Sequence, residues 1–269
     1  MDARGRGHSI PAVTQPTDTP GVRFEAEGPR ACITLARPER HNALGNADVA
    51  TLSAMLQRVD SDESFRVLVL TGAGEATFCS GASLREMRTG EMSGDRFDVL
   101  TRQLARSRVP TICRLNGNVY GGGAELALCC DFRIGTPGVR LSVPAARLGV
   151  CYPPGGLQRY VARLGLTTAT RILLAAEEMD AKELTRVGFL TRCVDRGELD
   201  DAVDALATRL AALAPLAVQA MKRIMLDVTD GSVDAEVARR LVEEVDASTD
   251  LREGLAAWSE DRAPRFEGR

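Results

Sequence analysis

A glycine-rich segment at residues 116–128 has the residue types needed to bind an anion through its backbone. A β-strand is expected to run into three glycines, Gly121 to Gly123, and a helix-forming stretch follows them. Glycines at a helix start leave backbone N–H groups accessible, and the positive end of the helix macrodipole lies uncovered there. The spacing matches neither the dinucleotide-binding fingerprint nor the phosphate-binding P-loop. The segment therefore predicts a site for an oxyanion.

Glu125 lies one turn into this predicted helix, close to whatever the glycine N–H groups bind. A carboxylate in that position can donate or accept a proton. Acidic residues are also common in the first turn of a helix because they favour its dipole. Glu125 is therefore a candidate acid or base, with an ordinary surface charge as the alternative.

A second segment of small residues, 79–83, follows a short buried strand expected at 67–70 and its loop. Small residues allow a ligand to approach the backbone closely. A helix can begin directly afterwards, at Leu84. A tight turn packed against the next strand would explain the same residues.

The composition excludes several classes of catalytic chemistry. The 269 residues include only two histidines, His8 and His41, and only two lysines. Zinc sites usually draw on several His or closely spaced Cys residues, and Ser or Cys hydrolases usually need a His as general base. We therefore expect no metal, and we expect proton transfer to fall to carboxylates, tyrosine or water. The seven cysteines follow no repeated spacing, and most of them resemble small buried hydrophobic residues, with Cys151 as the exception.

The charge balance gives no sign of a polyanionic partner. Thirty-four basic and 37 acidic residues give a net charge of −3, and no extended basic run is present. We therefore expect neither a nucleic-acid-binding surface nor a membrane-binding one. The sequence has no apolar leader and no membrane-spanning run, so a reducing, cytoplasmic setting is expected.

The elements that must position these segments alternate between strand and helix. A β-hairpin is expected over 22–35, a helix over 49–59, and further strands at 67–70, 109–115 and 132–134. Strands that alternate with helices indicate βαβ units, hence an α/β fold with a largely parallel sheet.

The chain becomes mostly helical after about residue 160. Its apolar stripes need a partner, which is either the α/β body or another subunit. We divide the chain into a tail at 1–20 that is expected to be disordered, a core at 21–200 and a C-terminal helical region at 201–269. The stripes are formed by Val203, Leu206, Leu210 and Leu213, by Val237, Leu241 and Val245, and by Leu251, Leu255 and Trp258.

Taken together and in this order, the two segments resemble the crotonase superfamily, which contains the enoyl-CoA hydratases and isomerases. Residues 37–44 look like its Arg-Pro…Asn-Ala-Leu signature, and 129–134 match the segment after its glycine-rich helix. Residues 155–159 are similar to its Gly-Gly-x-Gln-Arg stretch, and 263–269 are similar to its usual ending. The resemblance extends from about residue 22 to the C-terminus. It implies the crotonase (ClpP/crotonase-like) fold, with repeated ββα units and a helical C-terminal region.

The resemblance also implies a substrate and a site. Family members bind an acyl-CoA thioester and stabilise its enolate with two backbone N–H groups, which match Ala82 and Gly122 here. Losing one comparable donor costs roughly 3–4 kcal/mol of transition-state stabilisation. Coenzyme A is part of the substrate, so no separate cofactor is expected. Further residues expected around the substrate are Ser83, Leu84, Arg85, Gly121 and Ala145, and Arg37, Arg40 and Arg85 are candidates for the CoA phosphates, with solvated surface arginine as the alternative.

The sequence departs from the hydratase pattern at a position that matters for proton transfer. Enoyl-CoA hydratases of this family use two glutamates around one water, and Glu125 matches the first of them. The second follows a proline, where residues 141–145 read Leu-Ser-Val-Pro-Ala. Ala145 cannot hold a proton, and the family's isomerases rely chiefly on the same glutamate. Ser83 is a milder departure, since the family commonly has Asp there.

Tyr152 is a candidate to replace the missing second glutamate as a proton donor. Residues 147–154 look like a segment of methylmalonyl-CoA decarboxylase, a family member that also lacks the second glutamate. Decarboxylation requires an enolate to be stabilised and then protonated, so an oxyanion hole and one phenol are sufficient. Alternatively, Tyr152 packs on the following Pro-Pro turn with its hydroxyl bonded locally. Cys151 beside it has no His or Lys in view to lower its pKa, which disfavours a nucleophilic role.

We therefore predict an acyl-CoA-processing lyase of the enoyl-CoA hydratase/isomerase type, with Glu125 as the main acid/base group and Tyr152 as its candidate partner. A malonyl-CoA-type decarboxylase that uses Tyr152 is one alternative. A non-catalytic acyl-CoA-binding protein is another. The resemblance implies a homotrimer or a dimer of trimers.

Overall fold

A computed structural model describes residues 21–269, and the predicted tail at 1–20 lies outside the described residues. The larger of its two sheets begins with the antiparallel hairpin expected from the sequence, and every later neighbour pairs in parallel. In spatial order the strands are β1 (Val22–Glu27), β2 (Arg30–Leu35), β3 (Val67–Gly72), β5 (Thr111–Arg114), β7 (Phe132–Gly135) and β10 (Arg192–Cys193).

The smaller sheet is built from the strands that follow β3, β5 and β7 along the chain. Each pair of strands then leads into one or more helices, so the predicted ββα units are present. The order in this sheet is β4 (Thr77–Cys79), β6 (Asn118–Tyr120), β8 (Arg140–Ser142) and β9 (Met179–Asp180), and only β8 and β9 pair antiparallel. The helices that follow β4, β6 and β8 are α2 (Leu84–Thr89) and α3 (Gly94–Ala105), α4 (Gly122–Cys129), and α5 (Pro154–Leu173).

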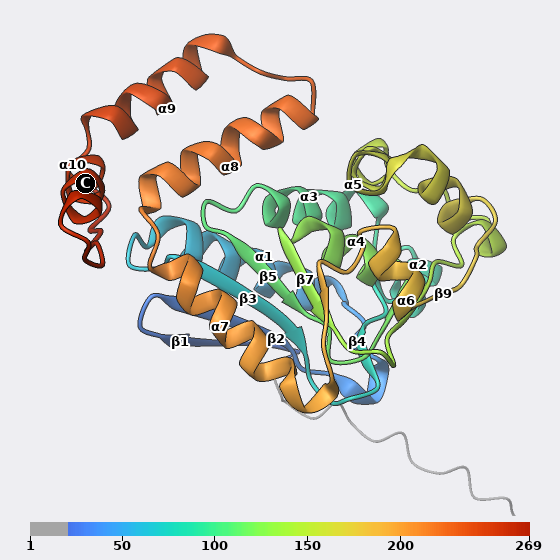
Figure 1. The fold of residues 1–269 in the computed structure, drawn as a ribbon. Helices are drawn as coiled ribbons and strands as arrows, with labels where there is room; N and C mark the ends of the chain where they lie inside the picture. The colour runs from blue at the N-terminus through green and yellow to red at the C-terminus, as the bar shows by residue number, and fades with distance from the viewer. Residues whose placement is uncertain (1–20) are drawn as a thin grey trace, which may run out of the picture.

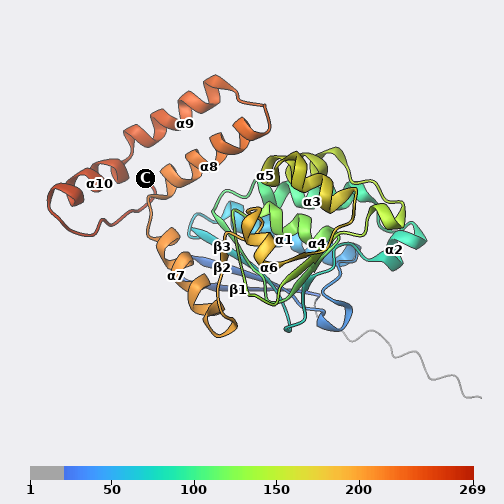
Figure 2. The same ribbon diagram turned by 45° about the vertical axis from the view of Figure 1, so that its right-hand side comes forward.

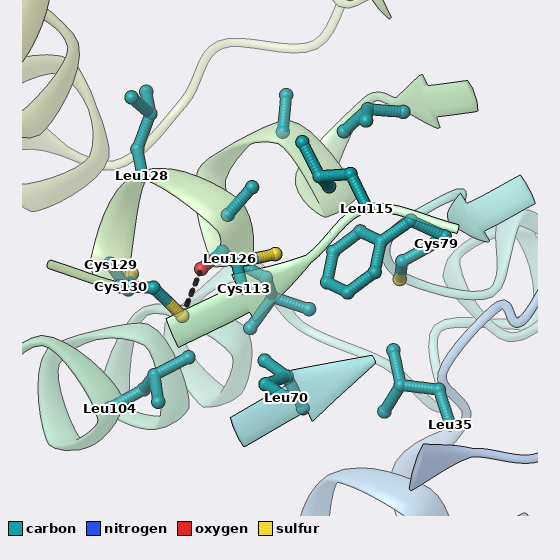
Figure 3. Packing of buried hydrophobic residues seen from close by; sticks show 14 of the residues in the cluster. Leu35, Leu70, Cys79, Leu104, Cys113, Leu115, Leu126, Leu128, Cys129 and Cys130 are labelled. Atoms are coloured by element: carbon teal, nitrogen blue, oxygen red, sulfur yellow. Dashed lines mark hydrogen bonds between the residues drawn. The ribbon is translucent and has the colours of Figure 1, made fainter. Parts of the chain in front are cut away.

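The buried core lies between these layers. The predicted apolar stripe forms α1 (Asn46–Ser61) and is buried through Leu52 and Leu56. Figure 3 shows the cysteines of this core among leucine side chains, with the Cys130 thiol donating to the Leu126 carbonyl at 3.7 Å. Burial raises the pKa of the Cys79 thiol to about 12. These thiols therefore behave as the small hydrophobic residues that the sequence predicted.

The C-terminal helices divide into two groups. Helix α7 (Leu199–Ala211) packs on the large sheet and buries Val203, Leu206 and Leu210 against it, so this stripe serves the core. Helices α8 (Pro215–Thr229), α9 (Ala235–Ala247) and α10 (Thr249–Ser259) form an extension beside the α/β body (Figures 1 and 2). The remaining short elements are α6 (Ala181–Arg186) and the 3₁₀ helices η1 (Pro38–Arg40), η2 (Ala146–Leu148) and η3 (Arg196–Glu198).

A buried lysine anchors the extension to the body. Lys222 of α8 donates from Nζ to the Val109 carbonyl and pairs with Asp131, both at 2.7 Å. In α10, Leu255 and Trp258 are 65% and 89% exposed, so residues 21–269 leave most of these two side chains uncovered. None of the described helices combines the length and the apolar character needed to cross a bilayer.

We predict that Gly123→Ala destabilises the fold. A Cβ at Gly123 would collide with the Cys79 carbonyl, which belongs to the backbone and cannot rotate away. Such overpacking typically costs about 1–3 kcal/mol, which urea denaturation would measure. The control is Gly197→Ala, because a Cβ there meets no atom within 4 Å. Equal stability of the two variants would contradict the proposed close packing of β4 and α4.

Candidate active site

A cavity of about 320 Å³ opens between α2, α3, α4 and the loop that precedes α5. Its wall is mostly apolar and includes Phe97, Leu148 and Pro153. The charged residues in the lining are Glu125 and Asp98, and no cationic side chain lines it. Burying an unpaired charge is costly, so this wall suits an uncharged, apolar group.

The two glycine-containing segments meet at this cavity through their backbones. Gly81 has φ +87°, and a Cβ on it would lie only 2.5 Å from the Gly122 nitrogen. Ala82 and Gly122 both line the cavity. The structure therefore places at one cavity the two residues, 40 positions apart in the chain, that the resemblance had paired.

Both amides are available to a ligand, each for a different reason. The Gly81 carbonyl accepts from Leu44, and the Ser83 amide donates to the Leu44 carbonyl, both at 2.8 Å. Because successive peptide groups of an extended strand point in opposite directions, the Ala82 N–H faces away from Leu44. Gly122 begins α4, where N–H groups have no intrahelical acceptor. The Gly121 amide is not available, because it donates to the Ser142 carbonyl at 3.0 Å.

Glu125 is the buried carboxylate of the cavity. It is 3% exposed, and its Oε1 accepts from Thr101 of α3 at 3.0 Å and from Arg159 of α5 at 2.7 Å. Its Oε2 makes no hydrogen bond to any of residues 21–269. Burial raises the pKa of Glu125, while the Arg159 guanidinium opposes that rise. One oxygen is therefore held in place and the other remains available for proton transfer.

Unpartnered polar atoms gather around this carboxylate. Within the described chain, three buried side-chain oxygens lack a hydrogen-bond partner, namely Asp98 Oδ1, Tyr152 Oη and Tyr160 Oη. The two tyrosine rings lie 6.0 Å apart, and Glu125 contributes to the electrostatic environment of both. An unsatisfied buried polar atom costs about 1–3 kcal/mol. Their concentration at one place is typical of a functional site rather than of ordinary core packing.

Tyr152, the candidate partner of Glu125, lines the cavity, and its hydroxyl is buried without a hydrogen-bond partner in the described chain. Burial raises the pKa of the Tyr152 phenol well above its usual value of 10, so the group is neutral near pH 7. Ala145 lines the same cavity, so the wall at this position carries a methyl group and no titratable group.

The structure divides the remaining predicted residues into two groups. Leu84 and Gly121 line the cavity, whereas Ser83 caps α2 by accepting from the Glu86 amide at 3.4 Å. The three arginines lie away from the cavity wall. Arg37 pairs with Asp48 at 3.3 Å, while Arg40 and Arg85 are exposed and make no ion pair within residues 21–269.

Sequence reasoning missed the partners of Glu125. The Gly-Gly-x-Gln-Arg motif contains Arg159 but does not indicate that it pairs with Glu125, and no motif contains Asp98 or Thr101. Asp98 and Thr101 lie three residues apart, as expected for one helix face. This spacing predicts that the two side chains lie on one face of a helix, but nothing in the sequence indicates that this face packs toward Glu125.

Comparison with known proteins agrees with this architecture. The ββα units and the cavity among their helices define a crotonase-fold protein. A model of the enoyl-CoA hydratase/isomerase family matches residues 26–269, and the chain belongs to that family.

Several characterised or solved proteins are similar over nearly the whole chain. A carnitinyl-CoA dehydratase of Proteus mirabilis is 34% identical over 88% of this chain and 94% of its own length. A 2,3-dehydroadipyl-CoA hydratase of Escherichia coli is 31% identical over 88% of this chain and 94% of its own length. The crystal structure of an enoyl-CoA hydratase from Bacillus anthracis has a TM-score of 0.85 at 28% identity, covering 93% of this chain and all of that one.

We predict that Arg159→Gln raises the pKa of Glu125 further, because the nearest cation that favours its charged form is removed. A pH titration of the ¹³C-labelled glutamate carboxyl groups by NMR would measure the change. Arg192→Gln is the control, since Arg192 is exposed and lies outside the cavity lining. An unchanged Glu125 titration in Arg159→Gln would show that the ion pair does not set the protonation of this carboxylate.

Proposed function

We propose that this enzyme converts an acyl-CoA thioester through an enolate intermediate, and that its reaction is a hydratase-type lyase step with a single catalytic glutamate. The observation that carries the proposal is the backbone contact between Gly81 and Gly122. It puts the amides of Ala82 and Gly122 on one cavity wall, together with Glu125. Two fixed N–H donors in an apolar site stabilise a developing oxyanion without reorganising.

In the proposed addition, Glu125 Oε2 accepts a proton from water while the water oxygen bonds to the β-carbon of a 2-enoyl thioester. The electron pair of the double bond moves to the thioester oxygen, which the two amides hold as an enolate. Glu125 then returns its proton to the α-carbon. The same carboxylate thus performs both transfers, and the bonds of Oε1 to Thr101 and Arg159 keep it in position.

The charge of the cavity wall points to an uncharged acyl group. The carboxylates of Glu125 and Asp98 line the wall and no cation does, so an additional carboxylate on the acyl chain would be buried without a partner. The names of some relatives, such as 2,3-dehydroadipyl-CoA hydratase and (E)-benzylidenesuccinyl-CoA hydratase, denote acyl groups that carry a carboxylate. We propose that this enzyme instead prefers a crotonyl-type substrate.

A second candidate reaction is the decarboxylation of a malonyl-CoA-type thioester, which the position of Tyr152 in the cavity wall favours. The carboxylate of this substrate has no cationic partner in the wall either, but the reaction removes that charge as neutral CO₂. Breaking the bond between the α-carbon and the carboxylate releases CO₂ and leaves the electron pair in the enolate. A proton from Tyr152 would then complete the reaction at the α-carbon. The raised pKa of this phenol keeps the proton available at neutral pH.

The assembly that we propose is a homotrimer or a dimer of trimers. The exposed apolar side chains of the extension support it, because a stripe containing Leu255 and Trp258 is unusual on a surface that stays in water.

Hydration is tested with crotonyl-CoA by following the loss of enoyl absorbance. We expect Glu125→Gln to lower kcat by about 10²- to 10⁴-fold, the usual contribution of general acid–base catalysis. Because Glu125 must be ionised to accept the first proton, kcat/KM should fall as the pH drops through its raised pKa. Full activity of Glu125→Gln would remove this residue from the mechanism. Calorimetric binding of acyl-CoA without turnover of any thioester would instead indicate a non-catalytic binding protein.

Decarboxylation is tested by following loss of the malonyl-CoA or methylmalonyl-CoA thioester and formation of the shortened one. If Tyr152 supplies the proton, Tyr152→Phe should lower kcat by about 10²- to 10⁴-fold and leave KM similar, because the ring is retained. Tyr120→Phe is the matched control, since Tyr120 lines the same cavity. Full turnover by Tyr152→Phe would exclude the phenol as the acid.

A further inference from the structure

A second cavity, of about 450 Å³, lies between α3, α5 and the C-terminal end of α8. The ion pair of Glu125 and Arg159 connects the two cavities, because Glu125 lines the first and Arg159 lines the second. Asp98 lines both. The second cavity thus begins directly behind the carboxylate that carries the proposed chemistry.

Four arginines line this second cavity, as two pairs with helical spacing. Arg102 lies in the last turn of α3 and Arg106 is the C-cap residue of that helix, while Arg159 and Arg163 lie one turn apart on α5. Residues four apart project from the same helix face. The lining contains only two carboxylates, those of Asp98 and Asp230, so the wall has an excess of positive charge.

The two pairs differ in how well their charges are compensated. Arg102 bonds to Asp98 at 2.7 Å, and Arg106 bonds to Asp227 at 2.8 Å and to Asp230 at 2.5 Å. The arginines of α3 are therefore neutralised by neighbouring carboxylates.

The arginines of α5 keep most of their donors. A guanidinium has five N–H donors, and Arg159 uses Nη1 for Glu125. Arg163 approaches Asp131 only to 3.9 Å, and its guanidinium makes no hydrogen bond to any of residues 21–269. Neutral polar groups complete this side of the cavity, including the hydroxyl-bearing Thr229.

We propose that the second cavity binds a phosphate group, held between the guanidinium groups of Arg159 and Arg163, and that the bound anion regulates Glu125. Arginine forks match the geometry of phosphate oxygens and form the stronger, charge-assisted type of hydrogen bond. The volume admits a phosphomonoester as well as free phosphate. The binding part of this proposal is independent of the reaction, whereas the regulatory part rests on the proposed function of Glu125.

The link between the site and the chemistry is electrostatic. A bound anion offsets the charge of Arg159 and competes for its N–H groups, so the carboxylate of Glu125 loses part of its stabilisation and holds its proton more tightly. Coupling of this kind is reciprocal, and protonation of Glu125 therefore favours anion binding. The other groups that face Glu125 remain in place, namely Thr101 and Asp98 from α3, Cys129 from its own helix, and Tyr152 and Tyr160.

Binding is tested on the full-length protein by calorimetry with inorganic phosphate, at an ionic strength held constant with chloride. We expect saturable binding that Arg163→Gln weakens by about tenfold or more, while Arg209→Gln, an exposed substitution on α7, leaves it unchanged. Adenosine 3′,5′-bisphosphate as a second probe distinguishes a nucleotide phosphate from free phosphate by tighter binding. Absence of saturable binding of both probes, or equal affinity in Arg163→Gln and wild type, would overturn the proposal.

Circular dichroism checks that Arg163→Gln is folded. If it is not, Arg163→Lys replaces it, because lysine keeps the charge and loses the fork, and an intermediate affinity is then expected. Unchanged affinity in a folded Arg163→Lys would also count against the site.

Regulation is tested by titrating Glu125 with NMR in the presence and absence of saturating phosphate. At a phosphate concentration that just saturates the wild type, we expect the Glu125 titration to move to higher pH, and in Arg163→Gln we expect a clearly smaller movement. The fall of kcat/KM for crotonyl-CoA at low pH should move to higher pH as well.

If phosphate binds and the Glu125 titration does not move, the regulatory part of the proposal is wrong. If the titration moves and no thioester is converted, the proposed function fails while the site stands.

Discussion

The close approach of two backbones, at Gly81 and Gly122, is the constraint on which the rest of the site depends. No side chain fits between the two segments, since a Cβ on Gly81 would meet the Gly122 nitrogen, and one on Gly123 would meet the Cys79 carbonyl. The contact aligns the end of β4 with the start of α4. It thereby sets the wall from which Ala82 and Gly122 present their amides and fixes where Glu125 emerges.

Local sequence patterns were sufficient to predict many of the helices and strands of this fold. The hairpin, the stripe of α1 and the short apolar run of β3 all follow from hydrophobic periodicity, which depends on neighbours only a few residues apart. The three glycines before Glu125 likewise predicted a helix start with accessible amides. The prediction that the amides of Ala82 and Gly122 act together came from the resemblance to a family, because no local pattern indicates which turn lies next to which helix.

What the sequence could not predict is set by contacts between distant segments. Glu125 receives its hydrogen bonds from α3 and α5, whose residues Thr101 and Arg159 lie 24 and 34 positions away. The partners of the C-terminal stripes were also undecided, and the structure buries that of α7 on the sheet while leaving Trp258 exposed. Each of these outcomes depends on helix orientation, which is a property of the whole fold.

Because the groups proposed to hold the enolate belong to the main chain, they persist through most amino-acid replacements around them. The side chains proposed to transfer protons, such as Glu125, form a separate set that single substitutions can change. A scaffold of this kind can therefore carry alanine at position 145, which holds no proton, and keep the two main-chain donors that we propose for the enolate. Evolution can in this way redirect the outcome of the reaction by altering a few codons, without rebuilding the part of the protein that makes the intermediate accessible.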